Sequence, residues 1–183
     1  MATSTGDIYE RELKYVLSGD KKAISQMIKT CSDDESRSYS LMLEDPFLVV
    51  RAAGSFGVDL VALRWDFSFP IEVKSSAEET MHFSRNPRLT EQAEKMKKAC
   101  CRPNLLPIYA FRLKSIRGDP WRVFTIPTDD ELKGKNELLR KVIPKMEVTN
   151  NGNFVMRWGE GLKLCDLILY MSGNIISEDI FEE

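Results

Sequence analysis

The chain has 183 residues, of which 43% are hydrophobic and 30% are charged, and its net charge is −2 with a pI near 5.6. This length and composition indicate one globular domain with its own core, and no apolar run is long enough for a membrane span or a signal peptide, so we expect a cytoplasmic protein. An acidic total counts against a protein that binds nucleic acid along a whole face, but a local basic patch remains compatible with such binding.

The cysteine and histidine content excludes several kinds of metal centre. The four cysteines show no Cys-x-x-Cys spacing, and we expect free thiols in a reducing compartment: Cys31, Cys100, Cys101 and Cys165. The single histidine, His82, excludes most histidine-rich metal sites and argues against a nuclease whose general base is a motif histidine.

Residues 7–18 predict an amphipathic helix, because their apolar side chains share one stripe: Tyr9, Leu13, Val16 and Leu17. Glu10 and Glu12 border this stripe on opposite sides, and periodicity does not decide which of them leans toward a neighbouring sheet. A second helix is predicted over 21–29, followed by a polar run over 31–40.

The middle of the chain predicts an α/β core. Strands are expected at 47–53, 58–64, 69–75, 106–113 and 121–126, and a helix over 88–101 lies between the third and fourth. This order gives a mixed sheet with a helical crossover. The inner stripe of the helix is expected to be Leu89, Ala93, Met96 and Cys100.

The C-terminal third, 128–183, predicts further elements. They are a helix over 131–142, a turn at 150–153, a short strand over 154–158 and an apolar helix over 162–171. The apolar face of the last helix either covers the sheet or forms a dimer contact.

The most informative residues lie on the predicted hairpin of strands 58–64 and 69–75. Glu72 and Lys74 point to the same face because alternate residues of a strand do so, and the hairpin brings Asp59 beside Glu72. Two carboxylates and a lysine form a site for a hard cation with a charge stabiliser, which is the chemistry of metal-dependent phosphodiester cleavage. The alternative is an exposed hairpin with ordinary polar alternation. The apolar run 60–63 and the low strand propensity of Asp favour the site.

These residues resemble known nucleases. Asp59 followed by Glu72-Val73-Lys74 resembles the signature of the PD-(D/E)XK nuclease superfamily, with Val58 in place of the usual proline. The string 49–62, together with Glu10-Arg11-Glu12-Leu13, is similar to the archaeal Holliday junction resolvase family. The strand 120–124 resembles the Gly-Trp-Arg strand of that family, and 159–169 resembles its C-terminal helix more weakly.

The resemblance implies a restriction-endonuclease-like core, with a central mixed five-stranded sheet flanked by helices. We therefore expect a single nuclease domain over 1–183. It would carry an inserted helical and polar segment at about 19–46 and a C-terminal helical extension at about 128–183. The insertion is interpreted as partly mobile, and as either an ornament or a clamp on the substrate.

The resemblance also implies the site residues. Asp59, Glu72 and the backbone carbonyl of Val73 would bind Mg²⁺, for which Mn²⁺ would substitute, and the family pattern selects Glu10 to complete the metal site. Lys74 would orient the attacking water or stabilise the transition state. The resemblance also implies that Arg11, Arg51 and Ser55 contact DNA, with Ser55 near the scissile bond. Arg85, Arg88 and Lys97 are expected to contact DNA for another reason, because they belong to a cluster of basic residues over 85–122. The alternative for Lys97 is a solvated helix face. Gln92 is expected near the site.

The resulting hypothesis is an Mg-dependent endodeoxyribonuclease of archaeal type that resolves four-way junctions. It would act as a homodimer that makes paired symmetric nicks, and it would recognise branched shape rather than sequence. The alternatives are a related repair nuclease acting on flaps or single strands, and a DNA-binding subunit that does not cut. A sliding clamp or a branch-migration helicase is a further partner implied by the resemblance.

Overall fold

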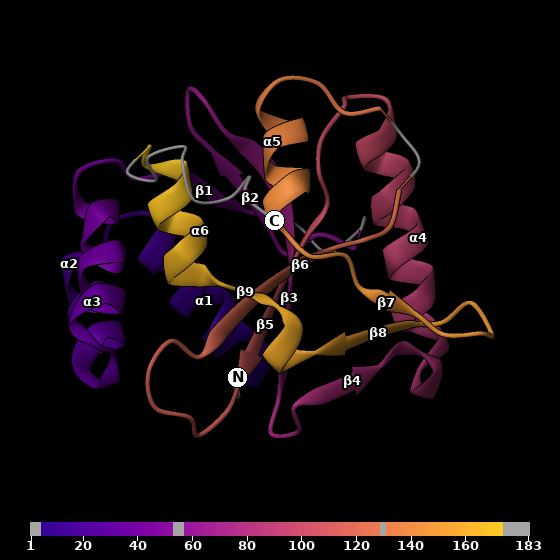
Figure 1. The fold of residues 1–183 in the computed structure, drawn as a ribbon, viewed down its shortest axis with the longest axis horizontal. Coiled ribbons are helices and arrows are strands. Elements are labelled where there is room, and N and C mark those ends of the chain that lie inside the picture. Colours follow the sequence, from indigo (N-terminus) through magenta and orange to yellow (C-terminus); the bar gives the residue numbers. More distant parts are fainter. Residues whose placement is uncertain (1–4, 53–56, 129–130, 174–183) are drawn as a thin grey trace, which may run out of the picture.

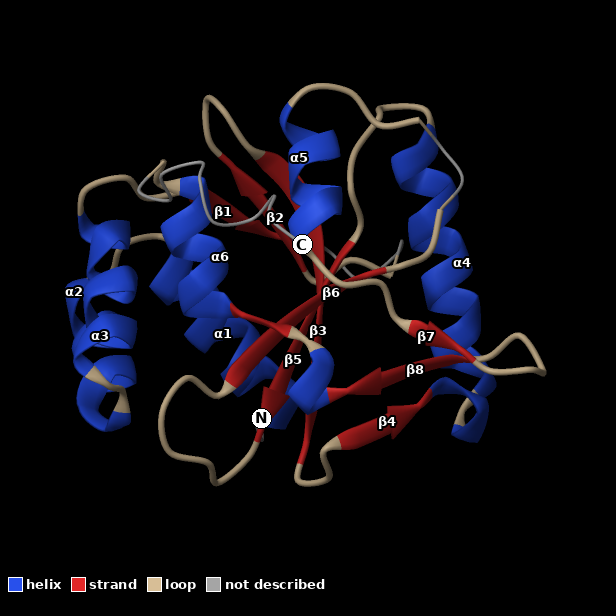
Figure 2. Cartoon of the chain, in the orientation of Figure 1, coloured by secondary structure: helices blue, strands red, loops and turns tan. Residues whose placement is uncertain are grey.

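The computed structural model describes residues 5–52, 57–128 and 131–173, and it is a mixed α/β fold (Figure 1). A six-stranded sheet has the order β1-β2-β3-β5-β6-β9, and a smaller sheet has the order β4-β8-β7 (Figure 2). The strands are β1 (Leu48–Arg51), β2 (Leu60–Leu63), β3 (Ser68–Ser76), β4 (Thr80–His82), β5 (Ile108–Leu113), β6 (Trp121–Thr125), β7 (Glu147–Val148), β8 (Phe154–Arg157) and β9 (Leu162–Lys163).

Helices lie on both faces of the large sheet. They are α1 (Thr5–Leu17), α2 (Lys21–Met27), α3 (Asp33–Ser40), α4 (Pro87–Cys101), α5 (Lys135–Val142) and α6 (Leu164–Met171). Short 3-10 turns are η1 (Ile28–Thr30), η2 (Leu41–Leu43), η3 (Phe83–Arg85) and η4 (Trp158–Glu160). No helix in the described part of the chain is long and apolar enough to cross a membrane.

The central topology follows the predicted order. β1, β2 and β3 form an antiparallel meander, α4 connects β3 to the parallel strand β5, and β6 returns antiparallel to β5. The expected number of five strands is wrong, because the sheet has six. The sixth strand, β9, pairs with Arg122 and Val123 of β6, so Leu162 and Lys163 are strand residues and the predicted last helix begins only at Leu164.

The two faces of the sheet pack against different helices. One face is covered by α1 and α6, which bury Leu13, Val16 and Ile168 against the sheet. The opposite face is covered by α4 and the smaller sheet, with Ala93 and Met96 in a separate core cluster. Figure 1 shows α4 on the far side of the sheet from α1, α2, α3 and α6. The apolar face of α6 is therefore buried within this chain.

The inserted segment is helical along most of its length. Its polar run forms α3 because Ser32 and Glu35 make a capping box, in which each side chain accepts a hydrogen bond from the other's backbone N–H. Tyr39 and Met42 are fully buried and join the core beneath α1 and α6. The segment is thus packed onto the domain by its own apolar side chains.

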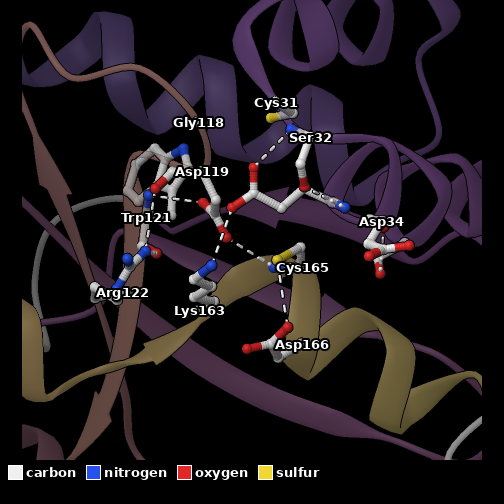
Figure 3. A network of polar contacts seen from close by, with 12 residues as sticks. Cys31, Ser32, Asp34, Gly118, Asp119, Trp121, Arg122, Lys163, Cys165 and Asp166 are labelled. Atoms are coloured by element: carbon white, nitrogen blue, oxygen red, sulfur yellow. Dashed lines mark hydrogen bonds and ion pairs between the residues drawn. The ribbon is translucent and has the colours of Figure 1, made fainter.

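A buried carboxylate ties this segment to the rest of the fold (Figure 3). Asp119, in the turn before β6, is 2% exposed and accepts three hydrogen bonds. The donors are the hydroxyl of Tyr39 at 2.7 Å and the backbone N–H groups of Trp121 and Cys165, each at 2.9 Å. α3, β6 and α6 consequently meet at one side chain.

Helix α5 begins later than the sequence predicts. The expected start was 131, but the helix starts at Lys135, directly after Gly134, whose φ is +56°. A residue with this backbone conformation cannot continue a right-handed helix, so the boundary lies there. Strands β4 and β7 were not predicted, and both pair with β8, which corresponds to the predicted strand over 154–158.

Candidate active site

Asp59 and Glu72 are neighbours across strands β2 and β3. Leu60 pairs with Ile71 in the antiparallel register, and the backbone N–H of Asp59 donates to the carbonyl of Ile71 at 3.0 Å. The negative charge of Asp59 acts on the buried carboxyl of Glu72, so the two acidic side chains lie close together. The carboxylate of Asp59 also accepts a hydrogen bond of 2.8 Å from the backbone N–H of Val73. The predicted hairpin brings the two acidic residues together.

Lys74 completes this group two residues along β3. Its ammonium group donates to Glu72 Oε1 at 2.6 Å and to Gln92 Oε1, on α4, at 3.3 Å. Ile71 and Val73 alternate with these residues and pack against the opposite core, as the strand periodicity predicts. Gln92, which the sequence indicated only weakly, thus reaches the group from the covering helix.

Gly57 allows α4 to approach the site closely. Its φ is +68°, a conformation that favours glycine, and a Cβ atom at this position would lie 2.8 Å from the backbone oxygen of Gln92. The contact places the backbone of α4 against the chain just before Asp59. The glycine therefore helps to set the distance between Gln92 and the strand residues.

The side chain of Glu72 is unusually placed for a carboxylate, since the residue is only 2% exposed. Burial and the negative charge of Asp59 raise its pKa, the ammonium group of Lys74 lowers it, and the net result is a pKa of about 7. Within the described residues, Glu72 Oε2 is buried without a hydrogen-bond partner. An ionised Glu72 at this position lacks part of the positive charge needed to balance it.

These residues fit a divalent cation. Carboxylate oxygens are the ligands that Mg²⁺ and Mn²⁺ prefer, and Glu72 Oε2 has the free lone pairs that such an ion would take. The described residues contain no group of three or more His, Cys, Asp or Glu side chains that could hold a metal ion. Protein ligation would therefore come from Asp59 and Glu72, with backbone oxygen and water as the remaining ligands.

Glu10 and Arg51 form a separate group beside α1. One guanidinium nitrogen of Arg51 lies 2.6 Å from Glu10 Oε2 and 2.8 Å from Asp7 Oδ1. Glu10 does not join Asp59 and Glu72 in a cluster of three acidic side chains. Its assignment as a metal ligand stays a prediction, and Ser55 lies outside the described residues.

The other basic residues are distributed over two surfaces. Arg11 lines an open hollow of about 410 Å³ together with Glu12, Tyr15 and Arg112, on the α1 side of the sheet. Three other basic residues lie near α4. Arg85 precedes the helix and pairs with Glu78 at 3.4 Å, and Arg88 and Lys97 are in the helix itself. Contact of these residues with DNA stays a prediction.

A groove beside α4 adjoins the candidate site. It has a volume of about 360 Å³ and is lined by Asn86, Arg88, Leu89, Glu91, Gln92 and Lys95. Gln92 belongs both to this groove and to the contact with Lys74. Lys95 was not among the residues selected to contact DNA, because periodicity does not show that the helix flanks a groove.

Tyr109 is a second residue that the sequence analysis did not single out. It pairs with Glu72 in the parallel register of β3 and β5, so it lies on the same face of the sheet. Its ring is fully buried among apolar side chains. The only sequence signal was a tyrosine in a mostly apolar strand.

The thiols near Asp119 do not form a second reactive site. The pKa of Cys31 is raised to about 11, mainly by burial and also by the charges of Glu35 and Asp119. Burial and the same Asp119 also raise the pKa of Cys165. Both thiols stay protonated at neutral pH, so neither is an activated nucleophile.

The likenesses of this chain to known proteins are structural. No family model and no curated protein match the chain. Among solved structures, it is similar to Hjc of Archaeoglobus fulgidus, described as a Holliday junction resolvase from an archaeal hyperthermophile. The TM-score is 0.47 at 20% sequence identity, and the match covers 75% of this chain and 96% of that one. At these values, the likeness alone establishes neither a family nor an activity.

Proposed function

We propose that this chain is a metal-dependent DNA endonuclease that resolves four-way junctions. The observation that carries the catalytic part is the arrangement of Asp59, Glu72 and Lys74, in which the buried oxygen Glu72 Oε2 has no hydrogen-bond partner among the described residues. The four-way junction as substrate comes from the sequence resemblance described above. Paired nicks by a homodimer belong to the same proposal, because a junction has two-fold symmetry.

Each residue of the site has a role in this proposal. Asp59 and Glu72 would hold a divalent cation, which when bound would supply Lewis-acid activation of the scissile phosphate and of a water. The hydrogen bond from the backbone N–H of Val73 fixes the carboxylate of Asp59. Lys74, held between Glu72 and Gln92, presents its ammonium group to the charge that develops on the phosphate oxygens.

The groove beside α4 would guide the DNA backbone to the site. Arg88 and Lys95 supply positive charge along it, and Gln92 connects it to Lys74. Contacts of this kind bind phosphates and carry no base specificity. They suit a protein that recognises branched shape.

The test is cleavage of a labelled synthetic four-way junction beside a flap, a single strand and a plain duplex. Wild type and Glu72→Gln are compared with Mg²⁺ and with EDTA, and urea unfolding checks that the variant is folded. Paired symmetric nicks in the junction alone, lost in the variant and in EDTA, would support the whole proposal. Cleavage of the flap or single strand would keep the chemistry and replace the substrate. Tight junction binding without cleavage in any metal would overturn the enzymatic proposal.

A further inference from the structure

Tyr109 lies beside Glu72 in the large sheet. The parallel register of β3 and β5 pairs the two residues, and the charge of Asp59, just before β2, acts on both of them. Glu72 and Tyr109 therefore project from adjacent strands toward α4. Tyr109 is 0% exposed, and its ring packs against Phe83 with centroids 5.8 Å apart.

Two polar atoms of this pair are buried and lack partners. Within the described part of the chain, neither Glu72 Oε2 nor the hydroxyl of Tyr109 makes a hydrogen bond. The hydroxyl is a donor and the carboxylate oxygen is an acceptor, so the two groups are chemically complementary. Burial and the negative charges of Glu72 and Asp59 raise the pKa of Tyr109, which keeps the donor proton in place.

Packing alone does not account for a tyrosine at this position. Phe111, two residues along β5, is equally buried on the same face and fills its space without a hydroxyl. A phenylalanine at 109 would provide the same ring and would not bury an unpaired polar group, which is unfavourable. The hydroxyl therefore points to a partner in the site.

We propose that Tyr109 is a positioning residue of the candidate active site. Its hydroxyl makes no bond to Glu72 Oε2 in the structure; when the carboxylate meets a divalent cation, the hydroxyl donates a hydrogen bond to that oxygen and fixes its orientation. The inference rests on the proposed function and deepens it. Carboxylates that bind metals are themselves held by hydrogen bonds, and loss of such a bond commonly weakens metal binding by about 10–100-fold.

The experiment compares Tyr109→Phe with Tyr39→Phe. Tyr39 is equally buried, but its hydroxyl already bonds to Asp119 at 2.7 Å, in the network that joins α3 to α6. Mn²⁺ binding is measured by calorimetry on the full chain, and urea unfolding is measured on the same samples. The Mn²⁺ binding that is lost in Glu72→Gln is the binding that belongs to the candidate active site.

Tyr109→Phe is expected to raise the Kd for Mn²⁺ by roughly tenfold, without a loss of stability. Tyr39→Phe is expected to leave this Kd unchanged and to lower stability. An unchanged Kd in Tyr109→Phe, or an equal rise in both variants, would overturn the inference.

The outcome separates this inference from the proposed function. If wild type binds Mn²⁺ through Glu72 but cuts no DNA, the proposed nuclease is overturned, and the comparison of the two tyrosine variants still decides the role of Tyr109. If wild type binds no Mn²⁺ at all, both the metal site and the role of Tyr109 are overturned.

Discussion

The hydroxyl of Tyr39 donates a hydrogen bond of 2.7 Å to the buried carboxylate of Asp119, although 80 residues separate them in the sequence. This contact connects the inserted segment to the turn that precedes β6. The other carboxylate oxygen accepts from the backbone N–H of Cys165 at the start of α6. The insertion is therefore held by hydrogen bonds to a buried carboxyl group as well as by apolar packing.

Replacement of Asp119 by Ala is expected to destabilise the chain by about 3 kcal/mol or more, because three buried donors lose their acceptor. Urea unfolding measures the change. Asp166→Ala is the control, since that side chain is exposed and its contact with the Cys165 thiol is a long one of 3.5 Å. A loss below about 1 kcal/mol for Asp119→Ala would contradict the role assigned to the network.

Stability should depend on pH through Glu72. The pKa of this carboxyl is raised in the folded state to about 7, so the folded chain binds a proton more tightly than the unfolded chain does. The resulting stabilisation is complete at low pH and is lost as the pH rises through about 7. Without divalent cations, the free energy of unfolding should fall by on the order of 2 kcal/mol between pH 5 and pH 8.

Glu72→Gln tests this assignment, because an amide does not titrate. The variant should lose the fall in stability between pH 5 and pH 8 that wild type shows. Chemical unfolding at both pH values in EDTA provides the measurement. Equal pH dependence in the two proteins would show that other groups cause it.

Much of the candidate site could be predicted because its geometry is local. The alternation of Glu72, Val73 and Lys74 on one strand fixes which side chains share a face, and a short hairpin brings Asp59 beside them. The core strands and α4 followed from apolar periodicity in the same way. These features depend on residues that are close in the sequence.

The remaining features depend on contacts between distant segments. Strand β9 has only two residues, and pairing with β6 makes Leu162 a strand residue although its sequence suits a helix. The place of Tyr109 beside Glu72 depends on a parallel register across α4, which periodicity does not determine. The prediction that Glu10 completes the metal site also concerned a contact between distant segments. In the structure, the carboxylate of Glu10 pairs with Arg51.

Lys74→Met should abolish most cleavage while the chain stays folded. The substitution removes the only ammonium group bonded to Glu72 among the described contacts and leaves developing charge on the phosphate unopposed. We expect a fall in the rate of at least about 100-fold, as when a charge-stabilising donor is removed elsewhere. Single-turnover cleavage of the junction gives the rate. Lys98→Met on the exposed side of α4 is the control and should cleave at the wild-type rate.

Gly57→Ala should lower both stability and activity. The added Cβ would lie 2.8 Å from the backbone oxygen of Gln92, so α4 must shift away from Asp59. Gly152→Ala is a matched control, because its φ is similarly positive at +76° but nothing lies within 4 Å of an added Cβ. An alanine at a positive φ strains the backbone and lowers the stability of both variants by an amount of order 1 kcal/mol. Only Gly57→Ala should lose more stability than this. Equal losses of stability and activity would show that the approach of α4 is unimportant.

Arg51→Gln is expected to weaken binding of the four-way junction more than it weakens the fold. The ion pairs of Arg51 with Asp7 and Glu10 are partly exposed, at 43% for the Arg51 side chain, and such pairs contribute at most about 1 kcal/mol to stability. A phosphate contact would be lost in the variant, so the slope of log K against log salt should decrease in magnitude by about 1.

Fluorescence anisotropy over a range of salt concentrations measures this slope. Arg37→Gln, which removes an exposed ion pair with Asp34 on α3, should leave the slope unchanged. If Arg51→Gln also leaves it unchanged, then Arg51 serves to hold Glu10 rather than to bind DNA.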